Sequence, residues 1–231
     1  MIRVLSILVL CFAMAGCATT SEKAQAAFTL QPGDLLFQDL DAGPLCDAIE
    51  TVTQGVDGAK FSHVGMVSHV DATGATIIEA VGAGVKETSI ADFLNRSASP
   101  DGTSRVLVGR IEGSARKLIP SAINVSRSFL GRPYDTVFTM DDSAFYCSEL
   151  IYESFRLANQ GKPIFDLFPM TFKDPTTNAT FPAWTSYYSD LATPIPEGQP
   201  GLNPGGMSRA PFVRIVHAYG APAGWTGSAA P

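Results

Sequence analysis

The chain has 231 residues, of which 45% are hydrophobic, with 16 basic and 22 acidic side chains and a formal net charge of −6 at pH 7. A chain of this length and composition buries a sizeable core, and we interpret it as one domain. The acidic balance argues against nucleic acid as a partner.

The first 16 residues have the layout of a secretory signal. Arg3 is their single charge, and an apolar run follows it from 4 to 15. That run is too short to span a bilayer as a permanent helix. The tetrapeptide Met-Ala-Gly-Cys that ends at Cys17 resembles the lipobox of bacterial lipoproteins. An ordinary signal cleaved nearby is the alternative.

The lipobox resemblance implies cleavage before Cys17 and acylation of that residue, with 17–27 as a lipidated tether. Ala18, rather than Asp, favours the outer membrane, on its periplasmic side. Removal of 1–16 takes one arginine away, so the mature chain has 15 basic against 22 acidic residues and a net charge of −7.

This processing leaves only two of the four cysteines as free thiols. Cys11 leaves with the signal and Cys17 is acylated, so Cys46 and Cys147 remain. In an exported protein two such thiols can form a disulfide, which is the structural alternative to a reactive Cys147.

In chain order, the domain is expected to begin at 28. A Pro-Gly turn precedes an apolar strand that ends at Gln38, and helical spacing predicts a helix over 45–53. The segments 62–70 and 75–81 are strand-like and flank Asp-Ala-Thr-Gly, which predicts an antiparallel hairpin.

This hairpin decides which residues face His63. If the pairing is centred on Ala72, Glu79 lies opposite Gly65, on the face of His63 and about 7 Å from it. A one-residue slip would send Glu79 to the other face, where it would be a solvated strand residue.

Further along the chain the pattern predicts a loop and a short helix over 85–94, with the helix at 90–94. A strand is predicted over 105–111 and a helix over 119–130. The segment 165–211 is rich in Pro, Gly and aromatic residues. We expect it to wrap the core and form a wall of a cleft.

A strand pattern returns at 212–218, which makes His217 a sheet histidine. The domain is expected to end at 220, with 221–231 frayed.

A fourth helix is predicted to begin at Cys147. Its apolar and small residues recur at spacings of three and four, at Cys147, Leu150, Ile151, Ser154, Phe155 and Ala158. Asp142 or Ser143 is the expected N-cap. The unpaired N–H groups and the dipole of a helix start stabilise a thiolate, the nucleophilic form of cysteine.

A cysteine hydrolase needs a thiolate, an imidazole, a polar residue that orients the imidazole, and donors for the oxyanion. Cys147, His63 and Glu79 are the candidates for the first three roles. The backbone N–H of Cys147, with Tyr146 or Gln38, is the candidate oxyanion donor set. Neither a metal site nor a phosphate loop is predicted, because the histidines and thiols are scattered and no glycine pattern fits.

Five motifs, in this order, resemble the YiiX-type permuted papain-like cysteine hydrolases, relatives of the NlpC-type cell-wall peptidases. They are Leu-Gln-Pro-Gly-Asp-Leu-Leu-Phe-Gln at 30–38, Phe-Ser-His-Val-Gly-Met-Val at 61–67, Ile-Ile-Glu-Ala at 77–80, Pro-Tyr-Asp at 133–135 and Tyr-Cys-Ser-Glu-Leu-Ile at 146–151.

The histidine precedes the cysteine, the reverse of the papain order, as circular permutation produces. The resemblance implies an α+β fold, in which an antiparallel sheet or small barrel packs on the helix of Cys147. It maps the family's nucleophile, histidine and third polar residue to Cys147, His63 and Glu79.

The leading function is an amidase or peptidase that forms a thioacyl intermediate, with cell-wall peptide as the substrate. One alternative is a lipid or acyl amide or ester hydrolase or acyltransferase, which a cleft lined by Phe168, Met170 and Phe172 would favour. Another is a binding module without turnover, which a bond between Cys46 and Cys147 would favour. The oligomeric state is not predicted.

Overall fold

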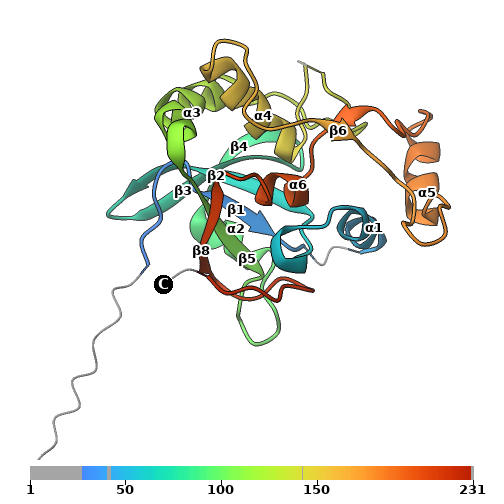
Figure 1. Ribbon diagram of the computed structural model, residues 1–231, viewed down its shortest axis with the longest axis horizontal. Coiled ribbons are helices and arrows are strands. Elements are labelled where there is room, and N and C mark those ends of the chain that lie inside the picture. The colour runs from blue at the N-terminus through green and yellow to red at the C-terminus, as the bar shows by residue number, and fades with distance from the viewer. Residues whose placement is uncertain (1–27, 41–42, 142, 230–231) are drawn as a thin grey trace, which may run out of the picture.

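The computed structural model describes residues 28–40, 43–141 and 143–229 (Figure 1). The expected signal, Cys17 and the tether lie outside the described residues, as does Asp142. Within the described ranges, no helix combines the length and apolar character that crossing a membrane requires.

The centre of the fold is a six-stranded antiparallel sheet with the strand order β4-β3-β2-β1-β5-β8. Its strands are β1 (Leu35–Gln38), β2 (His63–Asp71), β3 (Gly74–Val81), β4 (Gly84–Ser89), β5 (Val106–Ile111) and β8 (Val213–Ala218). A separate antiparallel pair joins β6 (Phe168–Pro169) to β7 (Pro200–Gly201).

Six α-helices and two 3-10 helices occur in the described part of the chain. The α-helices are α1 (Pro44–Val52), α2 (Ile90–Asn95), α3 (Ile119–Ser128), α4 (Cys147–Ala158), α5 (Pro182–Asp190) and α6 (Pro204–Ser208), and the 3-10 helices are η1 (Val56–Gly58) and η2 (Gly113–Leu118). The antiparallel sheet packed on the helix of Cys147 confirms the predicted α+β class.

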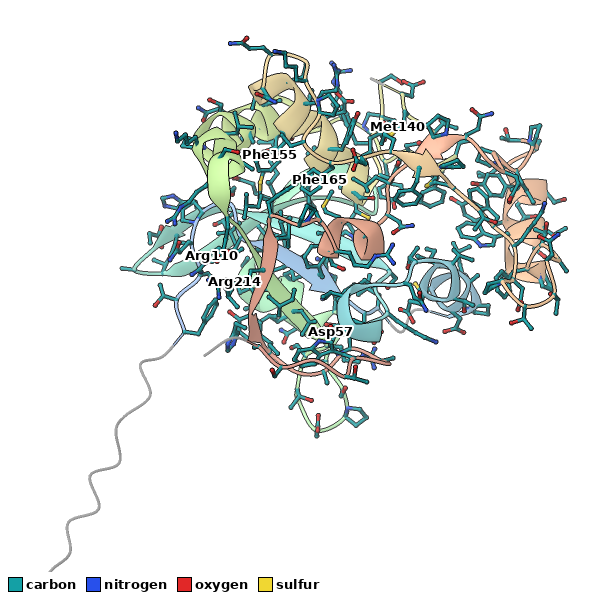
Figure 2. The ribbon with its side chains drawn as sticks, in the orientation of Figure 1. Asp57, Arg110, Met140, Phe155, Phe165 and Arg214 are labelled. Atoms are coloured by element: carbon teal, nitrogen blue, oxygen red, sulfur yellow. The ribbon has the colours of Figure 1, made fainter. Side chains whose placement is uncertain are left out.

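Alternating side chains of the strands bury both faces of the sheet. On β1, Leu35 and Phe37 join the core that includes residues of α3 and α4, whereas Leu36 joins a second core with Phe93 of α2. Figure 1 shows α3 and α4 together on one side of the sheet. Within the first core, Phe155 of α4 meets Phe165 edge to face with 6.0 Å between ring centroids (Figure 2). Helix α4 is thereby held rigidly against the sheet.

A third, smaller core lies between α1 and α5. Ala48 of α1 packs with Phe172, Trp184 and Tyr188, and the Tyr188 hydroxyl donates to the Val137 carbonyl at 2.9 Å. The aromatic residues of 165–211 are therefore packed, as the sequence predicted. In Figure 1 this part of the chain extends to one side, beside α1.

Two local predictions are wrong. The stretch 84–89, which was expected to be mostly loop, is strand β4. Its sequence lacks the alternation of apolar and polar residues that predicts a strand, but its backbone pairs with β3 along its whole length. The tail is not frayed at 223–226: Ala223 N–H donates to Oδ2 of Asp39 at 2.8 Å, and Thr226 N–H donates to the Asp57 carbonyl at 3.0 Å. These backbone hydrogen bonds to Asp39 and Asp57 fix the segment 223–226 to the rest of the domain.

Candidate active site

A β-bulge in the hairpin of β2 and β3 decides which residues face each other. Near the turn Asp71 pairs with Gly74, a register that would continue to Met66 opposite Glu79. A one-residue shift in the middle of the hairpin instead pairs Met66 with Ile78. Because side chains alternate between the faces of a sheet, this shift reverses the relative face of every residue beyond it.

The shifted register brings Glu79 to the face of His63. Nε2 of His63 lies 2.7 Å from Oε2 of Glu79, and both side chains are buried. The sequence predicted this pairing from a turn centred on Ala72. The structure reaches it differently, through a two-residue turn followed by the bulge.

Arg96 completes the surroundings of Glu79 and was missed by the sequence analysis. Its Nη2 donates to the same Oε2 at 2.6 Å. Burial by itself raises the pKa of Glu79, but the hydrogen bond and charge of His63, together with Arg96, lower it to about 2. Glu79 is therefore ionised at neutral pH. No spacing rule links Arg96 to Glu79, because α2 carries the arginine back to the sheet.

His63 lies between Glu79 and Cys147. Its Nε2 is bonded to Glu79, which leaves Nδ1 for the sulfur of Cys147. Burial would lower the pKa of His63, but the hydrogen bonds to Cys147 and Glu79 raise it to about 9. At neutral pH the imidazole is therefore positively charged beside the sulfur of Cys147.

The start of α4 is held by Glu149. Oε2 of Glu149 accepts the Tyr146 N–H at 3.2 Å, and Oε1 accepts the Asp141 N–H at 2.9 Å. The N-cap is Tyr146, so the prediction of Asp142 or Ser143 is wrong. The helix begins at Cys147, as predicted, and Glu149 reaches back to accept the N–H of the residue that precedes Cys147.

Burial also decides the charge of Glu149. It is 1% exposed, and burial raises the pKa of its carboxyl to about 9 despite the two N–H groups that it accepts. A neutral Glu149 places no negative charge near the sulfur of Cys147. It acts as a buried structural partner.

The backbone N–H of Cys147 fits its expected role. No acceptor for it occurs within the described residues, since the first α4 bond is donated by Leu150 to the Tyr146 carbonyl. The first N–H groups of a helix lack intrahelical partners. This N–H is available to an oxyanion formed beside the sulfur.

Gln38 is not placed as an oxyanion donor. Its Nε2 donates to the Phe93 carbonyl at 2.6 Å and to Oγ of Ser97 at 3.0 Å, which engages both amide hydrogens. That prediction is wrong, because Gln38 lies on the sheet face covered by α2 and joins α2 to β1.

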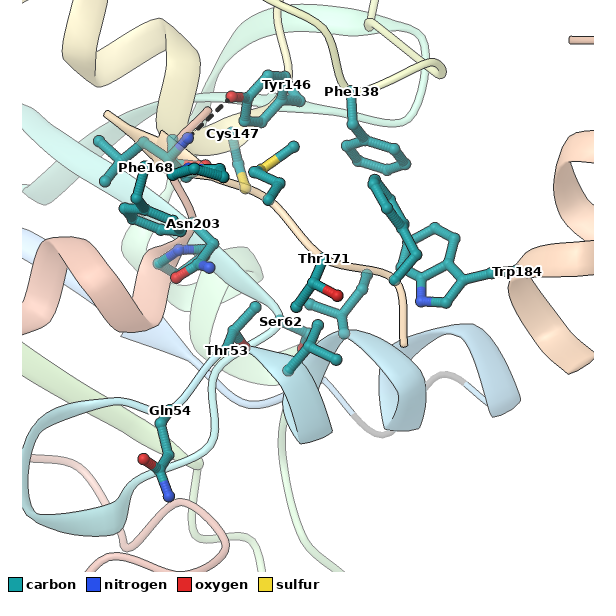
Figure 3. Close-up of a pocket in the computed structure, with 18 of the residues that line it drawn as sticks. Thr53, Gln54, Ser62, Phe138, Tyr146, Cys147, Phe168, Thr171, Trp184 and Asn203 are labelled. Atoms are coloured by element: carbon teal, nitrogen blue, oxygen red, sulfur yellow. Dashed lines mark hydrogen bonds between the residues drawn. The ribbon is translucent and has the colours of Figure 1, made fainter. Parts of the chain in front are cut away.

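Tyr146 lines the cavity beside Cys147, but its hydroxyl is already engaged. The oxygen accepts the Leu202 N–H at 3.3 Å (Figure 3), and the hydroxyl donates its proton to Sδ of Met140 at 3.3 Å. Tyr146 ties the start of α4 to β7 in this structure, and a donor role would require its proton to turn away from Met140.

Asn203 is a second residue that the sequence analysis missed. It lines the same cavity as Cys147, and its Oδ1 accepts the Gly206 N–H at 2.7 Å as the N-cap of α6. No acceptor for its amide nitrogen is found in the described ranges. The Asn-Pro-Gly order is typical of a helix N-cap and would have identified the cap, though not its position beside Cys147.

Cys147 opens into a cavity of about 340 Å³ (Figure 3). Most of its lining is apolar or aromatic: Ile49, Val52, Tyr134, Phe138, Tyr146, Phe168, Pro169, Met170, Phe172, Trp184, Leu202 and Pro204. The polar lining residues are Thr53, Gln54, Ser62, Ser148, Thr171, Asn203 and Arg209. Residues of 165–211 thus form a wall of the cleft, as predicted.

The remaining cysteine and histidines are separate from this arrangement. Cys46 and Cys147 form no disulfide with each other. His217 stacks on Phe28 with 4.2 Å between ring centroids, which confirms its interpretation as a sheet histidine. His69 lies beside Asp71 on an exposed part of the hairpin.

Comparisons with a protein family and with a known protein both point to relatives of the YiiX type. A family model described as permuted papain-like amidase enzyme, YaeF/YiiX, C92 family, matches residues 29–217. The uncharacterized protein YiiX of Escherichia coli K12 is 30% identical over 139 residues, which cover 57% of this chain and 61% of that protein.

A solved structure resembles the fold. It is described as metalloprotein YiiX from Escherichia coli O157:H7, with a TM-score of 0.65 and 23% identity, and the match covers 83% of this chain and 98% of that one.

Proposed function

Because the chain belongs to the permuted papain-like amidases of the YaeF/YiiX type, the C92 family, we propose that it cleaves amides whose acyl group is apolar. It is an enzyme of the cysteine hydrolase type. The observation that carries the finer proposal is the position of Cys147 in the wall of a cavity lined mainly by apolar and aromatic side chains.

The first step is attack of the Cys147 sulfur on the amide carbonyl carbon. The N–H of Cys147 stabilises the oxyanion, and His63 gives its Nδ1 proton to the departing nitrogen as the C–N bond breaks. The products are an amine and a thioester on Cys147. Glu79 keeps the ring in place through Nε2.

Water completes the cycle. Neutral His63 takes a proton from a water molecule, which attacks the thioester carbonyl, and the carboxylic acid leaves as the sulfur departs. Glu79 and Arg96 hold the imidazole in one orientation for both steps. An amine or alcohol in place of water would give acyl transfer through the same thioester.

The lining supports an apolar acyl group over a polar one. Phe168, Met170 and Phe172 all line the cavity, and Trp184 and Phe138 extend the aromatic surface (Figure 3). Each methylene buried against such a surface contributes about 0.8 kcal/mol to binding. A narrow polar groove would have argued for a peptide chain instead.

Cell-wall peptide is the second candidate substrate. It is supported by the lipoprotein signal that the sequence predicts at 1–17, which would place the enzyme in the periplasm, anchored to the outer membrane through Cys17. Among the polar lining residues, Gln54 offers its side-chain amide to a peptide, whereas the hydroxyl groups of Thr53 and Thr171 already donate to Phe61 and Glu197. A binding module without turnover has no support, because the Cys147, His63 and Glu79 contacts are intact.

A metal ion does not fit the described residues. The related structure is described as a metalloprotein, but no group of three or more His, Cys, Asp or Glu side chains suited to a metal occurs in the part of this chain that the structure describes. Nε2 of His63 is bonded to Glu79, and its other nitrogen faces Cys147. The mechanism therefore has no step that involves a metal.

A chain-length series tests the proposal. The purified full-length protein is given N-acyl anilides, whose leaving amine is uncharged, with acyl groups from acetyl to octanoyl, and a cell-wall tetrapeptide for comparison. We expect kcat/KM to rise roughly fourfold per methylene until the cavity is filled. The Cys147→Ala protein serves as the control and should release no amine.

Two other outcomes would contradict the proposal, one for its substrate and one for its mechanism. Cleavage of the tetrapeptide with no dependence on acyl length in the anilides would transfer the assignment to cell-wall peptides. Turnover in the Cys147→Ala protein would remove the thioester mechanism altogether.

A further inference from the structure

One residue in the wall of the cavity has a strained backbone. Phe138 lines the cavity beside Cys147 and has a φ of 59°, in the left-handed region that bulky side chains rarely adopt. We propose that Phe138 is a gate, whose ring narrows the cavity in this conformation and swings outward to admit substrate to Cys147. This inference rests on the proposed function, because it concerns access to the same site, and it adds a moving part to that site.

The strain at Phe138 can be released locally. A residue other than glycine keeps a left-handed φ only where its surroundings hold it there, and such residues cluster at ligand clamps and switch segments. Within the described ranges, no hydrogen bond involves the N–H or the carbonyl group of Phe138. A rotation to a negative φ therefore relieves the strain and breaks no backbone hydrogen bond of that residue.

The chain is anchored on both sides of Phe138. Oδ1 of Asp135 accepts the Val137 N–H and Oδ2 accepts the Thr139 N–H, each at 2.7 Å. The Val137 carbonyl in turn accepts the Tyr188 hydroxyl at 2.9 Å. An outward movement of the Phe138 ring is thus confined to a short segment, as it is at a hinge.

Aromatic contacts oppose the release of this strain. The Phe138 ring meets three rings edge to face, with centroid separations of 6.2 Å to Tyr134, 5.8 Å to Tyr146 and 5.8 Å to Trp184. A tilted contact at 6.1 Å joins it to Tyr187. The contacts stabilise the inward conformation and the left-handed φ destabilises it, so the outward conformation is a minor state that the substrate can select.

Phe138 lies at the rim of the cavity. It is half-buried, and in Figure 3 its ring lies between Tyr146, the neighbour of Cys147, and Trp184 on the far side. A ring in this position narrows the space between Cys147 and the aromatic side of the cavity. Its outward movement widens the path to the sulfur and leaves Cys147 in place, because α4 is packed on the sheet.

Tyr187 makes it possible to distinguish a gate from a fixed wall. Its ring contacts Phe138 and its hydroxyl donates to the Thr136 carbonyl at 2.7 Å, but it is not among the residues that line the cavity. Shortening Tyr187 therefore keeps the lining and removes a contact that holds Phe138 inward. A gate would open more often after that change, whereas a fixed wall would not respond.

Two alkylating reagents of different size measure access to Cys147. The full-length protein is treated with iodoacetamide or with its N-phenyl derivative, which share the reacting carbon and the leaving iodide. Labelling is followed by mass spectrometry of the Cys147 peptide. The ratio of the two rate constants, bulky over small, reports the opening of the cavity, because changes in the reactivity of the sulfur cancel.

Three variants test the gate. In Tyr187→Ala the ratio should rise about 3- to 10-fold, because one aromatic contact with Phe138 is lost. In Phe138→Gly it should rise about 10-fold or more, because both the ring and the strain are gone. The matched control is Tyr219→Ala, which removes a half-buried tyrosine that meets His217 edge to face at 4.7 Å outside the cavity lining and should keep the wild-type ratio.

Urea denaturation checks that each variant is folded. If Tyr187→Ala does not fold, Tyr187→Leu takes its place, because leucine keeps much of the apolar volume and has no ring to contact Phe138. The same rise in the ratio is expected.

Three outcomes would overturn the gate and leave the amidase assignment standing. A ratio that rises in Phe138→Gly alone would make Phe138 a fixed wall, and a ratio unchanged in both variants would show that Phe138 does not limit access. An equal rise in Tyr219→Ala would indicate general loosening of the fold. The proposed function fails separately, if the wild type releases no amine from the acyl anilides, because alkylation requires no turnover.

Discussion

Nε2 of His63 and Oε2 of Glu79 lie 2.7 Å apart although the hairpin register at the turn, continued unchanged, would place them on opposite faces of the sheet. The bulge between Val67 and His69 makes the contact, and Arg96 adds a second donor to the same oxygen. Five predictions concern this pair, the residues that support it and the start of the helix of Cys147.

Replacing Glu79 by Gln keeps the shape of the side chain and removes its charge. We expect kcat to fall by about 10²- to 10⁴-fold, because an amide oxygen holds the protonated imidazole less firmly than a carboxylate does. Steady-state amidase kinetics measure the loss, and circular dichroism checks that the fold is kept. A fall of less than threefold would show that Glu79 does not position His63.

Arg96 is a positioning residue that acts through Glu79. In Arg96→Gln the pKa of Glu79 should rise from about 2, because one of the cations that stabilise its carboxylate is lost. The acid limb of the kcat/KM profile should therefore move to higher pH, with a smaller loss at pH 8. A uniform fall at every pH would indicate structural damage instead, and Arg96→Lys should restore part of the profile.

The protonation of His63 can be followed directly by NMR. Its pKa of about 9 lies above the ordinary 6.5, so the stability that its protonation contributes is fully present below pH 6.5 and is lost as pH rises through 9. We expect its ring signals to titrate near pH 9. In the Cys147→Ala variant the midpoint should fall, because the hydrogen bond to the sulfur is gone.

His217 provides an internal reference for that experiment, because burial lowers its pKa below the ordinary value. Its titration should be the same in both proteins. A His63 midpoint near 6.5 in the wild type would contradict the charged pair at the site.

Gly65 leaves the space that the side chains of Ile77 and Phe93 occupy beside Glu79. A Cβ at this position would come 2.6 Å from Cγ2 of Ile77 and 2.9 Å from Cε2 of Phe93. Gly65→Ala should therefore cost about 1–3 kcal/mol of unfolding free energy in urea and also lower kcat, since Glu79 lies opposite. As a control, Gly102→Ala tests only the strain of its positive φ, because a Cβ there meets no atom within 4 Å.

Glu149 supports the start of α4. Glu149→Ala leaves the buried N–H of Tyr146 and the partly buried N–H of Asp141 without this acceptor, and we expect a loss of about 1–3 kcal/mol of unfolding free energy. Alkylation of Cys147 by iodoacetamide should slow as well, because the helix start becomes less ordered. Unchanged urea denaturation would show that water replaces the carboxyl at no cost.

Much of this site could be predicted from the sequence because its signals are local. The spacing of apolar residues located the helix that begins at Cys147, the alternation of 62–70 located the strand of His63, and the order of the five motifs indicated the family. The face shared by Glu79 and His63 was predicted from a symmetrical turn, whereas the structure attains it with a bulge, which no local rule required.

The sequence analysis missed the capping role of Glu149, although its contacts with Tyr146 and Asp141 are local. The positions of Arg96 and Asn203 and the engagement of Gln38, in contrast, depend on segments far apart in the chain. Helix α2 brings Arg96 to Glu79 and engages the Gln38 amide, and α6 brings Asn203 beside Cys147. Propensity and periodicity describe one element at a time, so the sequence by itself predicted which residues are candidates for the nucleophile and its base, and which elements carry them. Packing between elements decided which polar groups contact His63 and Glu79, and how apolar the cleft is. The reason is that burial and long-range hydrogen-bond partners exist only once the chain has folded.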